Sequence, residues 1–257
     1  MLYILISIVL LFLWVCTIPI LTILCLLGMP FAFLMVCGGI VQSMIIKYER
    51  TSNIRRLLAS LPFEKWFYQI DTVNVPDKVL VTCHPHGIFC LGPLLGIHLQ
   101  PQATTWFAVA PILFYIPLFG YIISKIGCIP ATHYHISQAL KKSSVILVPG
   151  GTPEIVLHEV KEYYTRRYGM FKFQAPLLPV ISSTHYTLWP MPARTWRVQV
   201  ARHNIPIVFP WLFGWYSTCL PKRKPIRLCV KDVFHPSGSL EDNRKRYYEN
   251  LIDRSWN

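Results

Sequence analysis

The tetrapeptide His84-Pro-His-Gly87 has residue types and a spacing that suit acid–base chemistry. The ring of Pro85 fixes its own φ angle and restricts the backbone of His84, while Gly87 permits close backbone approach or a positive φ angle. A neutral imidazole near its pKa can take a proton from an alcohol as a general base. A pair of hydrogen-bonded core histidines would give the same pattern, so the tetrapeptide alone leaves both interpretations open.

The segment Pro149-Gly-Gly-Thr-Pro-Glu154 places two glycines before an expected helix, with Thr152 suited to the N-cap. Backbone N–H groups at Gly150 and Gly151 could hold an anion, either a phosphate or the oxyanion of acyl transfer. Glu154 could orient a histidine, or it could simply complement the helix dipole. The segment is thus a second candidate for chemistry.

A metal site is an alternative use of the histidines. His84 and His86, together with His133 and His135, could supply four imidazoles, with Glu154 nearby. The chain lacks the H-E-x-x-H motif and the H-x-x-H-H boxes of di-iron lipid hydroxylases, and it also lacks G-x-S-x-G and G-x-G-x-x-G. The absence of these motifs favours metal-free chemistry, and a metal-dependent membrane hydrolase or oxidoreductase is the alternative.

Strands that alternate with helices must position these motifs. We expect strands over 78–83, 104–110, 144–148, 177–182 and 226–230, and helices over 112–126 (interrupted near Pro117), from Thr152 onward and over 239–254. This alternation predicts an α/β domain, and sites in such sheets form beyond the carboxyl ends of the strands. The segments 84–87 and 149–154 both follow directly on an expected strand.

The N-terminal segment predicts a membrane anchor. The chain is 53% hydrophobic and only 14% charged, whereas soluble domains carry roughly 25% charged residues. No charged residue or histidine occurs between Leu2 and Ile46, and one helix of that length would be about 68 Å long. Because the hydrocarbon core is about 30 Å thick, we expect a transmembrane helical hairpin of 2–23 and 31–46, followed by one domain over 47–257. One crossing with a re-entrant piece is the alternative.

The net charge of +13 lies entirely in residues 47–257. Lysines and arginines after a membrane span favour the cytosolic side, and they attract anionic headgroups or a polyanionic substrate such as a nucleotide thioester. No nucleic-acid-binding module is visible. The eight cysteines form no C-x-x-C pair, which is typical of reduced thiols.

Taken in order, these motifs resemble the diacylglycerol and monoacylglycerol O-acyltransferase family, type-2 branch. The resemblance rests on the hairpin and on the following segments: His84-Pro-His-Gly-Ile88, Ile116-Pro-Leu-Phe-Gly-Tyr121, Gly127-Cys-Ile-Pro130, Val148-Pro-Gly-Gly-Thr-Pro-Glu154, Arg167-Tyr-Gly-Met-Phe-Lys172, Leu178-Pro-Val180 and Leu220-Pro-Lys-Arg-Lys-Pro225. They cover most of residues 80–254.

The resemblance implies a glycerolipid-acyltransferase-like α/β domain that transfers a fatty acyl group from acyl-CoA to a neutral acylglycerol, with diacylglycerol the foremost acceptor. His86, with His84 second, would be the base, and Glu154 the second essential polar residue. The substrate-binding residues implied in this way are Gly87, Gly150, Gly151, Thr152, Arg167 and Gly169. Acyl-CoA would be a substrate, with no cofactor and no metal, and the expected location is the cytosolic face of the endoplasmic reticulum membrane.

Several positions depart from the family pattern. Ala131-Thr132 stands where Asn-Arg is frequent, Ser182-Ser-Thr-His185 stands where Phe-Gly-Glu is common, and the stretch from 169 to 179 is shorter. Related glycerol-phosphate acyltransferases have an Asp five residues after the histidine, but this chain has Leu91 and Phe89 at those places. We therefore expect an uncharged acceptor alcohol. A non-catalytic lipid-binding scaffold and a homo-oligomer both stay open.

Overall fold

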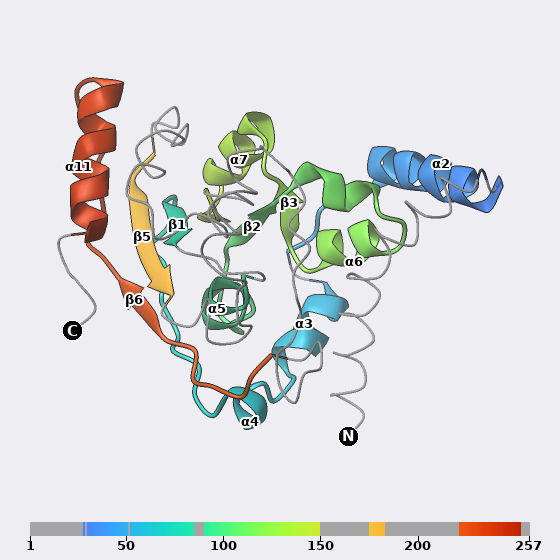
Figure 1. Ribbon diagram of the computed structural model, residues 1–257, viewed down its shortest axis with the longest axis horizontal. Helices are drawn as coiled ribbons and strands as arrows, with labels where there is room; N and C mark the ends of the chain where they lie inside the picture. Colours follow the sequence, from blue (N-terminus) through green and yellow to red (C-terminus); the bar gives the residue numbers. More distant parts are fainter. Residues whose placement is uncertain are drawn as a thin grey trace. The chain divides into compact units, whose positions relative to one another are not determined.

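We describe a computed structural model of the chain for residues 28, 30–50, 52–84, 90–149, 175–182 and 221–252 (Figure 1). The chain divides into two compact units, residues 1–61 with 106–136 and residues 62–105 with 137–257. The helix α7 (His133–Leu140) runs from the first unit into the second. The expected domain boundary between residues 46 and 47 stays a prediction.

The second unit is built on a mostly parallel sheet. Its described strands lie in the order β4 (Val145–Leu147), β1 (Leu80–His84), β5 (Leu177–Ser182) and β6 (Leu228–Val230). β1 runs parallel to β4 and to β5, and β6 runs antiparallel to β5. The expected strands at these places and the α/β class are thereby confirmed.

The continuous apolar runs of these strands explain why they form the core. Leu80, Val81, Val145, Ile146 and Leu177 are all fully buried. Strands of a parallel sheet are covered on both faces, so they read as unbroken apolar runs instead of alternating ones. Burying each such side chain stabilises the fold by about 1.5–3 kcal/mol, which holds the register of β1 against both neighbours.

The second unit also contains helical segments. They are α4 (Glu64–Phe67), α5 (Leu91–Pro93), the π-helical turn η1 (Leu94–His98) and α11 (Leu240–Ile252), which is drawn next to β5 in Figure 1. Gly92 lies against the end of β5, because a Cβ atom there would be 2.8 Å from the Ser182 hydroxyl. A Cβ at Gly96 would be 2.4 Å from the backbone oxygen of Asp71. Only glycine permits both of these approaches.

The first unit contains β2 (Trp106–Val109), which pairs in parallel with β3 (Cys128–Pro130). Between them lie the 3-10 helix η2 (Pro111–Tyr115) and α6 (Phe119–Lys125). The expected interruption near Pro117 is confirmed, since Leu118 between the two helices has a φ angle of 63°. The short strand β3 was not expected from the sequence, because three residues carry too little periodicity to be recognised.

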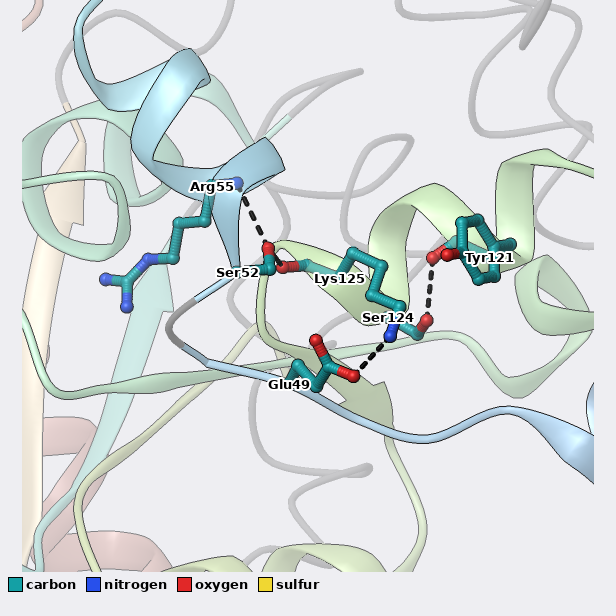
Figure 2. A network of polar contacts seen from close by, with 6 residues as sticks. All are labelled: Glu49, Ser52, Arg55, Tyr121, Ser124 and Lys125. Carbon is teal, nitrogen blue, oxygen red and sulfur yellow. Dashed lines mark hydrogen bonds and ion pairs between the residues drawn. The ribbon is translucent and has the colours of Figure 1, made fainter.

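A polar network fixes the segment before α3 (Asn53–Ala59) to the end of α6 (Figure 2). Lys125 forms an ion pair with Glu49, and the N–H of Glu49 donates to the backbone oxygen of Ser124 at 3.0 Å. The Ser52 hydroxyl donates to the backbone oxygen of Lys125 and accepts from the N–H of Arg55 at 3.2 Å, which caps α3. The network thus joins segments more than 70 residues apart in the sequence.

The expected second half of the hairpin is a helix, α2 (Pro30–Ile45). Among the residues that the structure describes, no helix has both the length and the hydropathy required to cross a bilayer. The expected first half of the hairpin and the expected helix from Thr152 lie outside the described residues, as does the aromatic stretch 209–216. Membrane crossing therefore stays a prediction.

Candidate active site

His84 is the last residue of β1, and its side chain is only 2% exposed. Its backbone lies opposite Ile181 of β5. The residue therefore stands at the carboxyl end of a strand inside a mostly parallel sheet, where sites of α/β proteins form. The expected position of His84 is confirmed by the fold, whereas its chemical role stays a prediction.

The buried hydroxyl of Tyr247 lies between two polar residues of β1. The Tyr247 Oη is 3.1 Å from His84 Nε2 and 2.5 Å from Thr82 Oγ1. Tyr247 and Thr82 are both fully buried, and the rings of His84 and Tyr247 meet at 63° with 6.1 Å between centroids. A hydrogen bond from α11 thus fixes the imidazole of His84.

The two glycine-containing motifs leave the sheet at one edge. β1 and β4 are parallel neighbours, and their last paired residues are Thr82 and Leu147. His84 and Pro149 each stand two residues beyond that pair, so both motifs continue from the same end of adjacent strands. This arrangement is what a joint site at the strand ends requires.

Most of the expected site residues lie outside the described part of the chain. These are His86, Gly87, Gly150, Gly151, Thr152, Glu154, Arg167 and Gly169. Their roles stay predictions, and the described residues contribute the strand ends from which residues 85–89 and 150–154 continue.

His135 on α7, one of the four histidines of the metal alternative, has structural contacts of its own. The N–H of His135 donates to the Thr132 hydroxyl at 3.3 Å, and the His135 Nδ1 lies 2.8 Å from the same oxygen. The Tyr48 ring packs edge-on to the His135 imidazole at 5.5 Å. Desolvation by burial lowers the pKa of His135 below its ordinary value of 6.5. Over the described residues, no three His, Cys, Asp or Glu side chains gather in a way that could hold a metal ion.

The structure also contains a buried imidazole that the sequence did not single out. His98 ends the π-helical turn η1, is fully buried, and has its Nδ1 3.2 Å from the Thr105 hydroxyl. An isolated histidine in an apolar stretch gives no signal that separates it from a core residue. Its partner Thr105 lies seven residues away, after a turn that the sequence pattern does not specify.

The chain is similar to one part of a known protein in its sequence and to a solved structure in its backbone. No family model matches the chain. The chain is 27% identical over 165 residues to the Homo sapiens protein 2-acylglycerol O-acyltransferase 3. The matched region covers 56% of this chain and 48% of that protein. The chain thus spans about half the length of this curated relative.

A solved structure is also similar at the level of the backbone. It is the crystal structure of the 1-acyl-sn-glycerophosphate (LPA) acyltransferase PlsC from Thermotoga maritima, with a TM-score of 0.45, 15% sequence identity and coverage of 84% of each chain. By its sequence, the chain is thus similar to part of a human acylglycerol O-acyltransferase.

Proposed function

We propose that the chain is a membrane-associated acyltransferase that moves a fatty acyl group from acyl-CoA to the hydroxyl of a neutral acylglycerol. The observation that carries the proposal is the parallel pairing of β1 with β4, which brings His84 and Pro149 to one edge of the sheet. The distant likeness to an acylglycerol O-acyltransferase supports the same reaction class.

In this proposal His86 is the general base and the glycine segment holds the developing charge. The imidazole takes the proton from the acceptor hydroxyl while that oxygen attacks the thioester carbonyl. The backbone N–H groups of Gly150 and Gly151 stabilise the resulting oxyanion. The carbon–sulfur bond then breaks, the coenzyme A thiolate leaves, and it takes the proton back from the imidazolium. The acyl group ends on the acceptor oxygen, without a covalent acyl-enzyme.

The acceptor in this proposal is an uncharged alcohol. Leu91 and Phe89 stand at the places where an Asp would follow the histidines in phosphate-accepting relatives, and Pro153 follows Gly151-Thr152 where those relatives have Arg. Diacylglycerol is the acceptor expected from the family resemblance, while the human relative is named for 2-acylglycerol. Both belong in the test.

An apolar surface on the first unit supports membrane association. It consists of exposed side chains of α2 and of the residues around η2 and α6, namely Phe33, Leu34, Val36, Ile40, Val41, Met44, Ile45, Ile112, Tyr115, Leu118 and Tyr121. We call this set the apolar surface. Exposed apolar patches of this kind mark interaction sites, and tyrosines are enriched at the membrane–water boundary. In the sequence, α2 follows a segment without charges, which favours a lipid bilayer as the partner of the apolar surface.

Polar contacts hold the two parts of the apolar surface together. The Gln42 side-chain amide donates to the backbone oxygens of Phe114 and Ile116 at 3.3 Å and 3.1 Å, and its oxygen accepts from the N–H of Leu118 at 2.8 Å. A leucine with a positive φ angle is strained, and such strain persists where surrounding contacts fix it. Leu118 is 59% exposed. We propose that the turn at Leu118 inserts into the headgroup region of the bilayer at the cytosolic face of the endoplasmic reticulum.

The activity is tested with purified full-length chain in detergent, labelled acyl-CoA, and a panel of diacylglycerol, 2-acylglycerol, wax alcohol, sterol and lysophosphatidate. We expect transfer to a neutral glyceride, and a loss of roughly 100-fold or more in His86→Ala. His235→Ala is the matched control, because His235 is exposed and lies outside the proposed site.

Three outcomes would contradict parts of the proposal. Unchanged transfer in His86→Ala would exclude His86 as the base. Faster acylation of lysophosphatidate than of any neutral alcohol would exclude the proposed acceptor class. One bound metal per chain, with activity lost to a chelator, would favour the metal-dependent alternative.

The membrane proposal is tested by flotation with lipid vesicles. Leu118→Asp places a charge at the corner of the apolar surface, and aspartate tolerates a positive φ angle better than leucine does. Leu57→Asp is the control, since Leu57 on α3 has the same 59% exposure but is outside the surface. We expect Leu118→Asp alone to reduce the floated fraction; equal flotation of both variants would contradict the assignment.

A further inference from the structure

The contact between α11 and β1 joins two distant parts of the chain at the candidate site. Tyr247 is separated from His84 by 163 residues and from Thr82 by 165, and its hydroxyl contacts both side chains. Thr82 and His84 stand two residues apart on one strand, so their side chains lie on the same face of the sheet. One tyrosine hydroxyl therefore bridges the last two side chains on that face of β1.

The hydroxyl of Tyr247 couples the hydrogen bonds of its two partners. It has one proton to donate, so it donates to one partner and accepts from the other. If it donates to His84 Nε2, the Thr82 hydroxyl donates to Tyr247, and the proton of the neutral imidazole is on Nδ1. If it accepts from Nε2–H, it donates to Thr82. In both arrangements the contact links the tautomer of His84 to Thr82.

Packing alone does not require this hydroxyl. A phenylalanine at position 247 would fill the same space and keep the edge-on contact with Phe234, whose ring lies 5.4 Å away at 81°. Burying an unpaired hydroxyl costs free energy, so the contacts with Thr82 and His84 stabilise the Tyr247 hydroxyl in this place. The polar contact is therefore specific to the strand end that carries the motif.

We propose that Tyr247 is a positioning residue whose hydroxyl sets the ring orientation and tautomer of His84. The inference rests on the proposed function, because its catalytic consequence requires the His84-Pro-His-Gly87 motif to carry the base. The role is indirect, because Tyr247 acts through the imidazole of His84.

The test compares Tyr247→Phe, Thr82→Val, their double variant and the rescue variant Thr82→Ser in the full-length chain. We expect Tyr247→Phe to lower kcat roughly tenfold while KM for acyl-CoA changes less than about twofold, because geometry is lost and substrate binding is retained. The pH profile of kcat should shift in Tyr247→Phe and in Thr82→Val. The double variant should lose no more than the worse single variant, and Thr82→Ser should keep most of the activity.

Tyr134→Phe is the matched control, because Tyr134 on α7 is 67% exposed. A second measurement does not depend on turnover: 15N NMR of the imidazole nitrogens, with the His84 signals assigned through His84→Gln. We expect the His84 signals to move in Tyr247→Phe and to stay in Tyr134→Phe.

Two results would overturn the inference. The first is wild-type kcat, pH profile and His84 signals in Tyr247→Phe. The second is a loss of activity that only parallels a loss of folded protein measured by circular dichroism, which would assign Tyr247 to stability. Failure of the proposed function is a separate result: a wild-type chain without acyl transfer refutes that proposal, while the NMR comparison still decides whether Tyr247 positions His84.

Discussion

At the scale of single residues, burial decides which reactive side chains can meet a reagent. Cys128 on β3 is 3% exposed, and burial raises the pKa of its thiol to about 12. Arg55 opposes this effect in part, since its charge lowers the pKa of the same thiol. Cys229 on β6, in contrast, is exposed. The sequence does not distinguish the two cysteines, since neither belongs to a C-x-x-C pair.

The two thiols should therefore differ in reactivity. At about pH 8, alkylation should modify Cys229 readily and leave Cys128 unmodified in the folded chain, because only the thiolate reacts. Peptide mapping by mass spectrometry after timed exposure to iodoacetamide measures both rates. Unfolding in denaturant should make the two rates equal, and equal rates in the folded chain would contradict the burial of Cys128.

His135 should make the stability of the fold depend on pH. Its pKa in the folded chain is lowered below 6.5 by desolvation, so the unfolded chain binds the proton more readily. The stabilisation is present above about pH 6.5 and is lost as the pH falls through the lower folded pKa. Chemical unfolding at a series of pH values should show this decrease in the free energy of unfolding. The decrease should be smaller in His135→Gln, and identical pH dependence in the variant would contradict the assignment.

At the scale of elements, one close contact fixes α2 to η2. A Cβ atom at Gly39 would lie 1.9 Å from the backbone oxygen of Tyr115, whereas a Cβ at the neighbouring Gly38 would meet nothing within 4 Å. Since a backbone atom of Tyr115 cannot turn away as a flexible side chain does, the helices must separate to admit a methyl group at position 39. Gly39 is thus required for the close approach of α2 to η2, whereas Gly38 is not.

Gly39→Ala and Gly38→Ala form a matched pair for this contact. Gly39→Ala should destabilise the chain by about 1–3 kcal/mol, the range for overpacking. Gly38→Ala should stabilise it by up to about 1 kcal/mol, since alanine favours the helix over glycine. Thermal unfolding in detergent measures both changes. Equal effects of the two substitutions would contradict the contact between α2 and η2.

At the scale of the whole molecule, charge and apolar residues are separated along the chain. Residues 2–46 carry no charge, while the net charge of +13 lies in residues 47–257. A membrane-bound chain of this kind would contact the bilayer through its apolar part and attract anionic headgroups through its basic part. The two contributions differ in how they respond to salt.

Binding to lipid vesicles should therefore depend only partly on ionic strength. Raising salt from about 50 mM to about 500 mM shortens the Debye length and should weaken binding to vesicles that contain phosphatidylserine. Binding to neutral phosphatidylcholine vesicles should change little, because it depends on the apolar surface. Co-sedimentation at both salt concentrations measures these fractions. Salt-independent binding to the anionic vesicles would contradict a contribution from the basic residues.

The sequence by itself determined the elements whose apolar pattern is continuous. The runs at 78–83, 144–148 and 177–182 predicted β1, β4 and β5, because strands covered on both faces must be apolar throughout. Pro117 predicted the break between η2 and α6, since proline cannot continue a helix from within. The location of His84 at a strand end followed from the same patterns. All of these features depend on residues close together in the chain.

Only the tertiary structure decided which distant residues meet. The parallel pairing of β1 with β4 brought His84 and Pro149 to one edge, and α11 placed the Tyr247 hydroxyl against His84 and Thr82. A tyrosine in a polar C-terminal helix has no local pattern that names its partner 163 residues earlier. The physical reason is that periodicity records which face of an element is buried. The partner across that face is set by packing of the whole chain.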